Sequence, residues 1–391
     1  MTDARWDRRP VRRVSAAAVV TGTLLLASCS SSVDPDWSAA ELPVPEGAPG
    51  RVAVRDAVHC GDAWWAVGGV VLDQPSETQD ARPAAWRSGD GTTWEALPVT
   101  ATTYWGRRAV LAGVACSGDT VVAIGARSGG AHGNPRVTTF FEEDGGLDDQ
   151  RAPFNLYGGA TATNVGPITG ADPGWLITGN RISGPAVWHS TDGRDFTIEE
   201  DVPGLADEEG VSSLAQGASW DGEAWVVVGG GSEAGTLDRQ PLEWTSPDAR
   251  TWQRHEVPGT DGFDDLERVV ATDDGLVALG LRGDRFGAWL RDDDGGWDAA
   301  SDFGSIPEES RSSPFVASLV SSGSGLWATT SNGSAYALWH SDDGDEWAEV
   351  SLPAAPPETA GEHVLAVAAH DDEVVLLADD GEGGRVWRAV R

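Results

Sequence analysis

The sequence predicts an all-β protein, a seven-bladed β-propeller of four-stranded antiparallel blades, and three observations support this prediction. The phrase "AVWHSTDGRDF" at 186–196 returns as "ALWHSDDGDEW" at 337–347. Related hairpins recur about every fifty positions along the 391 residues, a period that is typical of propeller blades. A short segment near the N-terminus also matches the outer strand of a blade and would close the ring. Six or eight blades are the alternatives.

Each phrase is typical of two strands joined by a tight turn. The Asp side chain accepts hydrogen bonds from backbone N–H groups two residues on, and Gly adopts a positive φ without a Cβ clash. Three further copies and one degenerate copy are found at 84–99, 242–258, 287–300 and 138–149. The aromatic residues that close the clear copies are Trp94, Phe196, Trp252, Trp297 and Trp347. Their spacing therefore indicates one blade per copy, with a degenerate blade in the first gap.

Each outer hairpin has a partner hairpin upstream. These inner hairpins are predicted at 51–69, 107–126, 164–180, 212–230, 266–281 and 315–331. A seventh, at 363–379, is followed by only one more strand, "GRVWRAVR". The missing strand is predicted in "DWSAAELPV" (36–44), which resembles "TWEALPV" (93–99). The seventh blade is thus shared between the two ends of the chain, which removes a free sheet edge.

Tryptophan is abundant, with 19 residues, and it recurs on the third strand of the predicted blades. These positions are Trp86, Trp188, Trp244, Trp289, Trp339 and Trp387. Large aromatic rings are effective at filling the space between sheets, so we expect them to pack between blades. Length alone favours two or three domains, but the repeats predict a single propeller domain over 36–391.

The N-terminus has the features of an export signal. Five arginines precede a short apolar run, "SAAAVVTGTLLLA" (15–27), and "LASC" ends at Cys29. This pattern resembles a bacterial lipoprotein signal peptide, which implies cleavage after residue 28, lipidation of Cys29 and a short tether over 29–35. The apolar run is too short to span a membrane. We therefore expect a lipid-anchored protein on the extracytoplasmic face of a bacterial membrane, with ordinary secretion or an uncleaved anchor as alternatives.

The charge of the chain restricts its partners. The formal net charge is −35, and all positive side chains apart from histidine are arginine. Nucleic acids and polyanionic glycans need a basic surface, so we expect neither as a ligand. Besides the membrane, which the lipid anchor would contact, the remaining candidates are an envelope protein or glycan, bound by a monomer.

Besides Cys29 the chain has two cysteines, Cys60 and Cys116, at matching positions of adjacent repeats. A disulfide would suit an oxidising exterior but requires Cα atoms within about 7 Å, so both redox states stay open. His370 holds the same position in the seventh blade, which allows a metal cluster that would lack a fourth ligand. Acidic runs at 264–265 and 292–294 could supply oxygen ligands to calcium, although neither has the ligand spacing of a dedicated site, and we expect no other cofactor.

The repeated Ser-x-Asp-Gly-x-x-Trp phrase resembles the Asp-box of sialidase-type propellers, which are also called BNR repeats. The matching residues are Ser88, Asp90 and Trp94; Ser190 and Asp192; Ser246, Asp248 and Trp252; and Ser341, Asp342 and Trp347. Most copies are one residue shorter than the usual Asp-box. The resemblance implies a structural turn away from any active site, so it supports the fold and says little about activity.

A sialidase-like enzyme would also need three convergent arginines, a tyrosine with a glutamate partner and an acidic proton donor. The chain has three tyrosines, Tyr104, Tyr157 and Tyr336, and its sequence does not reveal such a set around them. The sequence therefore favours a protein without catalytic activity, and an enzyme is the alternative.

Long connections leave the second and fourth strands of the blades, and in an up-and-down blade these lie on one face of the ring. Loops on a rigid scaffold commonly hold binding sites. On this face Tyr104, Trp105, Arg107 and Arg108 form a compact aromatic and basic patch, which is the candidate binding site. We therefore predict a non-catalytic binding or scaffold protein at the cell envelope. An extracytoplasmic glycoside hydrolase or lyase is the alternative.

Overall fold

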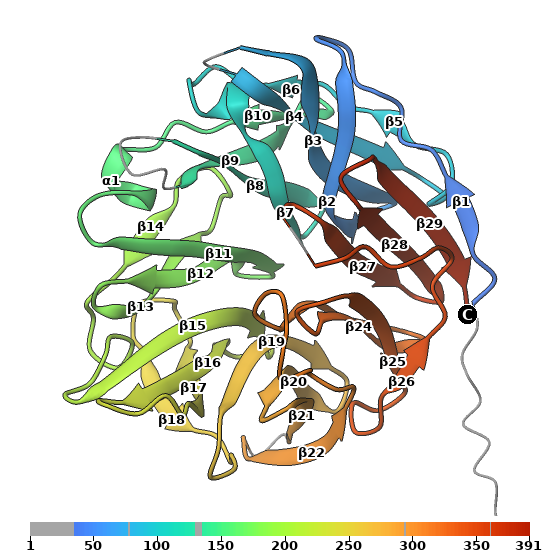
Figure 1. Ribbon diagram of the computed structural model, residues 1–391. Helices are drawn as coiled ribbons and strands as arrows, with labels where there is room; N and C mark the ends of the chain where they lie inside the picture. The colour runs from blue at the N-terminus through green and yellow to red at the C-terminus, as the bar shows by residue number, and fades with distance from the viewer. Residues whose placement is uncertain (1–34, 77–78, 130–134, 293–294, 360) are drawn as a thin grey trace, which may run out of the picture. The chain divides into compact units, whose positions relative to one another are not determined.

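The computed structural model describes residues 35–391 except for 77–78, 130–134, 293–294 and 360. These residues form seven sheets that follow one another around a ring (Figure 1). Each sheet is one blade, so the predicted seven-bladed propeller is confirmed. The predicted signal peptide and Cys29 lie outside the described residues. In the part of the chain that is described, no helix is long and apolar enough to cross a membrane.

In each blade the strands follow chain order from the centre of the ring outward, except that β1 and β6 are the outermost strands of blades 7 and 2. Blade 1 contains β2 (Gly50–Cys60), β3 (Ala63–Ser76), β4 (Gln79–Ser88) and β5 (Glu95–Ala96). Blade 2 contains β7 (Val110–Ser117), β8 (Thr120–Ser128), β9 (Pro135–Glu143) and β10 (Gly146–Asp149). Blade 3 contains β11 (Ala162–Ala171), β12 (Gly174–Arg181), β13 (Gly184–Ser190) and β14 (Thr197–Glu199). Blade 4 contains β15 (Val211–Trp220), β16 (Trp225–Glu233), β17 (Gln240–Ser246) and β18 (Gln253–Glu256).

The remaining blades continue this order. Blade 5 contains β19 (Asp264–Thr272), β20 (Gly275–Arg282), β21 (Arg285–Arg291) and β22 (Trp297–Phe303). Blade 6 contains β23 (Phe315–Ser322), β24 (Gly325–Ser331), β25 (Tyr336–Ser341) and β26 (Ala348–Val350). Blade 7 contains β27 (Val364–His370), β28 (Glu373–Asp379), β29 (Gly384–Val390) and, from the other end of the chain, β1 (Ser38–Ala40). Two short helices, η1 (Gly106–Arg108) and α1 (Phe154–Tyr157), lie in connections between blades.

The ring is closed by the N-terminal strand, as the sequence predicts. β1 pairs antiparallel with β29, with Ser38 opposite Arg388 and Ala40 opposite Val386. Next to this strand, the Trp37 indole N–H donates to the carbonyl oxygen of Ser351 at 3.1 Å. β1 thereby covers the outer edge of β29 in blade 7 (Figure 1). The Trp37 hydrogen bond also joins this N-terminal segment to the connection that leaves blade 6.

Blade 2 differs from the four-stranded prediction by one strand. β6 (Val99–Thr100) pairs in parallel with β10, with Val99 opposite Leu147. The Leu147 N–H also donates to the carbonyl oxygen of Pro98 at 3.0 Å. The segment entering this degenerate blade therefore satisfies backbone groups on the outer edge of β10, which are otherwise without a partner strand.

The predicted packing of tryptophan between blades is confirmed. Trp86, Trp188, Trp244 and Trp289 are fully buried, and Trp339 and Trp387 are nearly so. Several of these indole N–H groups also donate to the backbone of an adjacent connection, as Trp86 does to Pro43 and Trp289 to Pro258, both at 2.8 Å. The rings thus contribute apolar burial, and the indole N–H is paired in Trp86, Trp188 and Trp289 but has no partner in Trp244.

The Ser-x-Asp-Gly turns share one hydrogen-bond pattern. In blade 1 the Asp90 carboxylate accepts the N–H groups of Thr92 and Thr93 at 2.8 and 2.7 Å and the Ser88 hydroxyl at 3.0 Å. These bonds hold the pKa of Asp90 well below its usual range. Gly91 has φ +68°, a conformation that glycine adopts without strain. Asp192 and Asp248 accept the corresponding N–H groups in blades 3 and 4.

In blade 6 the prediction of Asp342 as the turn aspartate is wrong, because Asp343 takes this position. Asp343 accepts the Asp345 N–H at 3.0 Å and the Ser341 hydroxyl. The Asp342 side chain is exposed and pairs instead with Arg391 at 2.8 Å. The turn requires an aspartate two residues after the serine, as in blade 1, and two consecutive aspartates concealed this register.

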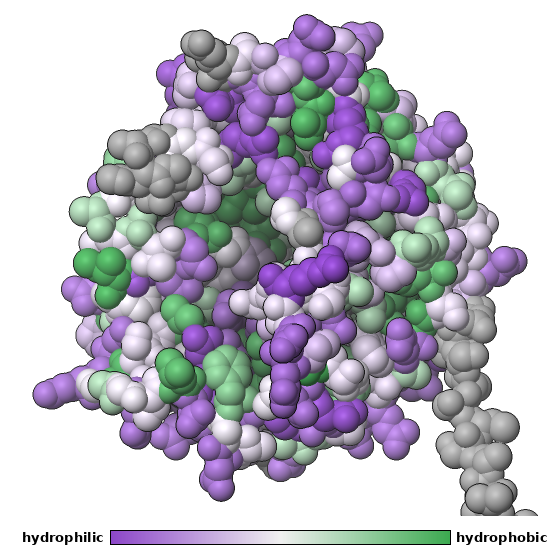
Figure 2. Space-filling model, in the orientation of Figure 1, coloured by the Kyte–Doolittle hydropathy of each residue, from purple (hydrophilic) through white to green (hydrophobic). Residues whose placement is uncertain are grey.

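The two faces of the ring differ. The turns between first and second strands and between third and fourth strands lie on one face, which we call the turn face. The connections between second and third strands and between blades lie on the other, the loop face, which Figures 1 and 2 present to the viewer. On the turn face a disulfide joins Cys60 at the end of β2 to Cys116 near the end of β7, with the Cα atoms 5.6 Å apart. It links blades 1 and 2.

The equivalent position in blade 7 does not join the cysteines. The His370 ring stacks on the His59 ring of blade 1, with centroids 3.6 Å apart. The metal cluster of Cys60, Cys116 and His370 is therefore excluded, because both sulfur atoms are in the disulfide. Among the described residues, no group of three or more His, Cys, Asp or Glu side chains is arranged to hold a metal ion.

Candidate functional site

The predicted aromatic and basic patch lies on the loop face, in the connection that enters blade 2. Asp149 at the end of β10 fixes this connection, since its two carboxylate oxygens accept the N–H and hydroxyl groups of Thr102 and Thr103. The Thr103 hydroxyl in turn accepts the Gly106 N–H at the start of η1 at 2.9 Å. The patch is thus held on an ordered turn and not on a free loop.

Three of the four predicted residues come together. The Tyr104 and Trp105 rings meet edge to face with centroids 4.8 Å apart. The Arg108 guanidinium lies 5.3 Å from the centroid of each ring and donates to the Tyr104 hydroxyl at 2.7 Å. Arg107 is exposed and turns away, donating to the carbonyl oxygen of Thr102. It is therefore not part of the cluster.

Two residues that sequence analysis did not single out complete this cluster. Arg136, from β9, lies 6.0 Å from the Trp105 ring centroid and 4.9 Å from that of Phe154, in α1. Phe154 is 65% exposed and Tyr104 is 47% exposed. A pocket of about 260 Å³ adjoins these residues and is lined by Trp105, Arg136, Phe154, Tyr157 and neighbouring residues. We call Tyr104, Trp105, Arg108, Arg136 and Phe154 the aromatic–arginine cluster.

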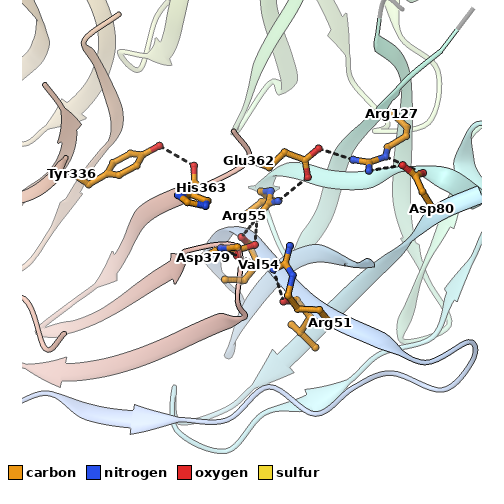
Figure 3. A network of polar contacts seen from close by, with 11 residues as sticks. Arg51, Val54, Arg55, Asp80, Arg127, Tyr336, Glu362, His363 and Asp379 are labelled. Atoms are coloured by element: carbon orange, nitrogen blue, oxygen red, sulfur yellow. Dashed lines mark hydrogen bonds and ion pairs between the residues drawn. The ribbon is translucent and has the colours of Figure 1, made fainter. Parts of the chain in front are cut away.

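The second feature of the loop face is a chain of alternating charges near the inner strand of blade 1 (Figure 3). Asp379, at the end of β28, is fully buried and accepts from Arg51 at 2.8 Å and from Arg55 at 2.5 Å. Both arginines belong to β2, so these bonds join blades 7 and 1. The Arg55 guanidinium also donates to the carbonyl oxygen of Val54 at 2.9 Å.

The chain of charges continues outward through Glu362. Its two oxygens lie 3.4 Å from Arg55 and 2.8 Å from Arg127. Arg127 forms a two-pronged pair with Asp80, at 2.8 and 3.2 Å. This pair lowers the pKa of Asp80 from its ordinary value. Three arginines and three carboxylates from blades 1, 2 and 7 and the connection before blade 7 therefore neutralise one another.

The remaining tyrosines do not provide a nucleophile beside a free carboxylate. The Tyr336 hydroxyl donates to the carbonyl oxygen of His363 at 2.9 Å, and burial raises its pKa (Figure 3). Tyr157 is buried, and burial raises its pKa above the ordinary tyrosine value. The carboxylates of the charge chain next to Tyr336 are all paired with arginine. This arrangement does not supply the tyrosine, glutamate and proton donor that a sialidase-like reaction requires.

A buried carboxylic acid lies deeper in the ring. Glu267 occupies a bulge in β19, and one oxygen accepts the Val316 N–H of blade 6 at 2.5 Å. Burial raises the pKa of Glu267 to about 8, and the nearby Asp265 adds to this effect. Asp265 is itself paired with Arg239. Asp264 accepts the Thr260 N–H, so both residues of the 264–265 run are engaged within the protein. Asp293 and Asp294 of the second acidic run lie outside the described residues.

Comparison with known proteins defines the fold and no more. No protein-family model matches the chain, and no curated protein matches its sequence. The β-propeller domain of the Trilobed protease from Pyrococcus furiosus superposes with a TM-score of 0.50 at 11% identity, covering 87% of this chain and 95% of that domain. A protein from Lactobacillus plantarum also gives 0.50, at 14% identity, covering 81% of this chain and 92% of that one.

A sialidase is also among the similar structures. Trypanosoma rangeli sialidase gives a TM-score of 0.46 at 14% identity, covering 91% of this chain and 60% of the sialidase. This chain therefore spans less than two thirds of that enzyme. The two matches with a TM-score of 0.50, at 11% and 14% identity, show the propeller architecture alone, and the residues of the site have to be interpreted from their own geometry.

We predict that Glu267→Gln flattens the dependence of stability on pH. A carboxyl group whose folded pKa is about 8, against an ordinary value of 4.5, favours folding while it is protonated. That contribution is complete below the unfolded pKa and is lost as the pH rises through the window between the two values, at about 1.4 kcal/mol per pH unit. Glutamine retains an oxygen for the Val316 N–H and does not ionise.

Urea unfolding at pH 5, 7 and 9 measures this effect. The wild-type free energy of unfolding should fall more steeply between pH 5 and 9 than that of Glu267→Gln, while Glu256→Gln, an exposed control, should follow the wild type. Parallel curves for all three proteins would show that Glu267 ionises normally.

Proposed function

We propose that this protein is a lipid-anchored, extracytoplasmic propeller that binds an envelope protein or glycan of a bacterium without catalysing a reaction. The observation that supports binding is the aromatic–arginine cluster. It exposes Tyr104 and Phe154 beside a pocket of about 260 Å³. Exposed aromatic rings stacked with arginine are the typical composition of interaction hot spots. Lipid attachment at Cys29 and the bacterial envelope location rest on the N-terminal sequence.

The electrostatics of the cluster favour recognition of a partner over non-specific adhesion. The chain is strongly acidic, at −35, yet Arg108 and Arg136 have no acidic partner among the described residues. Each guanidinium lies against two aromatic rings instead. A ligand that stacks on the rings and places a hydrogen-bond acceptor against the guanidinium groups would use both features. A monomer without a cofactor is sufficient for this function.

A glycoside hydrolase is the alternative. Its catalytic groups would have to lie elsewhere than in the charge chain of Figure 3, where every carboxylate is paired with arginine. Turnover of an aryl glycoside by two independent preparations of the protein would favour this alternative over the binding function.

We predict that Arg108→Ala weakens ligand binding at least about tenfold, because the guanidinium stacks on both Tyr104 and Trp105 and its loss removes a desolvated contact. Arg107→Ala is the matched control, since it removes the same charge from the adjacent residue outside the cluster. The measurement is surface binding of fractionated envelope glycans and envelope proteins to immobilised full-length protein. Equal losses in the two variants would reduce the effect to net charge, and no loss in either would exclude the cluster as the site.

We predict that Cys29→Ser releases the protein from the membrane, because serine has no thiol to carry the lipid. The measurement is the distribution between membrane and soluble fractions in the producing bacterium, together with the intact mass. Wild-type protein should be found in the membrane fraction with the mass of an acylated chain that starts at Cys29. An unmodified wild-type mass would contradict the proposed anchor.

A further inference from the structure

A cavity of about 650 Å³ lies at the centre of the ring, towards the turn face. Its walls come from the innermost strands of all seven blades, namely β2, β7, β11, β15, β19, β23 and β27. Most of the lining side chains are small or aliphatic, as at Ala57, Val114, Ile168, Ala317 and Val367. The cavity is separate from the aromatic–arginine cluster, which is on the rim of the loop face.

Six of these strands contain a bulge, and the residue after the bulge occupies an equivalent position in each. These residues are Asp56, Gly113, Ile168, Gly217, Arg268 and Ser318. Only Asp56, in blade 1, and Arg268, in blade 5, are charged. Since blades 1 and 5 are not neighbours in the ring, the two charges face the cavity from different sides.

Asp56 is held rigidly by the backbone and still has acceptor capacity. One carboxylate oxygen accepts the Ala57 N–H at 2.9 Å, and the other accepts the Val114 N–H of blade 2 at 3.0 Å. Each carboxylate oxygen can accept a second hydrogen bond. The side chain lines the cavity, so this remaining capacity is directed to a ligand or to water.

Arg268 is arranged in a complementary way. Its Nε donates to the carbonyl oxygen of Ala317 at 3.1 Å and its Nη1 to that of Glu267 at 2.7 Å. Among the described residues no acceptor contacts Nη2, and the side chain lines the same cavity. Asp56 and Arg268 do not form an ion pair with each other, although each is near enough to affect the other's pKa.

We propose that this cavity binds a small zwitterion, an amino acid or a short peptide, with its ammonium group at Asp56 and its carboxylate at Arg268. Among the charged side chains of the lining, Asp56 and Arg268 lie on inner strands between apolar residues, whereas Asp172 is exposed in the turn after β11. The two inner charges stabilise a ligand that carries the opposite pair, because each of them then loses its water only where an opposite charge of the ligand replaces it. The charges of the protein also favour a zwitterionic ligand. A protein with a net charge of −35 repels a simple anion, and a simple cation would leave Arg268 unpaired.

The test is isothermal titration calorimetry on the full-length protein. Glycine, β-alanine, 4-aminobutyrate and glycylglycine present the two charges at increasing separation and distinguish a free amino acid from a peptide. N-acetylglycine and glycinamide each retain only one of the charges. We expect at least one zwitterion to bind, and the two single-charge analogues to bind at least about tenfold more weakly than it does. No binding by any zwitterion at millimolar concentration, or equal binding by a single-charge analogue, would overturn the proposal.

Two variants assign the charges to their roles. Asp56→Asn should reduce the affinity for the zwitterion at least about tenfold and should not weaken that for N-acetylglycine, because only the ammonium contact is lost. Asp172→Asn, at the rim of the same cavity, is the matched control and should retain wild-type affinity. If Asp56→Asn does not fold, as judged by its thermal unfolding, Arg268→Lys provides the second test by weakening the carboxylate contact. Equal affinity in the control and in the cavity variants would also contradict the site.

Discussion

The pairing of β1 with β29 is the constraint on which the rest of the structure depends. A blade buries its two apolar faces only between two other blades, so seven blades satisfy one another only when the ring is complete. Here the last blade takes its outer strand from the start of the chain, and three residue pairs join the two ends. The buried third-strand tryptophans then pack between blades in six of the seven blades, and in blade 2 the buried Phe140 is on the third strand instead.

Closure also brings together residues that are far apart in the sequence. Asp379 of blade 7 meets Arg51 and Arg55 of blade 1, and Glu362 meets Arg127 of blade 2 (Figure 3). Viewed from the loop face, hydrophilic residues surround a hollow near the middle of the ring, with hydrophobic residues in its depth (Figure 2). On the turn face the same closure lets seven inner strands enclose one cavity. The two candidate sites therefore lie on different parts of one rigid scaffold.

The architecture could be predicted from the sequence because its signals are local. The blades are identified by turn residues such as Asp90 and Gly91 and by tryptophans at regular spacing. These signals also identify blade 7, which the two ends of the chain share. The choice of Asp343 over Asp342, the parallel β6 and the contact of Arg136 and Phe154 with Trp105 depend on register or tertiary packing, which spacing does not specify. The repeats of the sequence align Asp56 and Arg268 as equivalent positions. Their placement in the wall of one cavity depends on the strand bulges and on the closed ring, which a sequence alignment does not show.

The most direct test of this account is hydrogen exchange, followed by mass spectrometry, on a variant lacking residues 36–44. The account predicts that the amides of β29 lose most of their protection and that β2 and β27, on either side of the closure, exchange faster as well. Protection of β29 equal to that in the complete chain would contradict the account, because the ring would then be stable without its N-terminal strand.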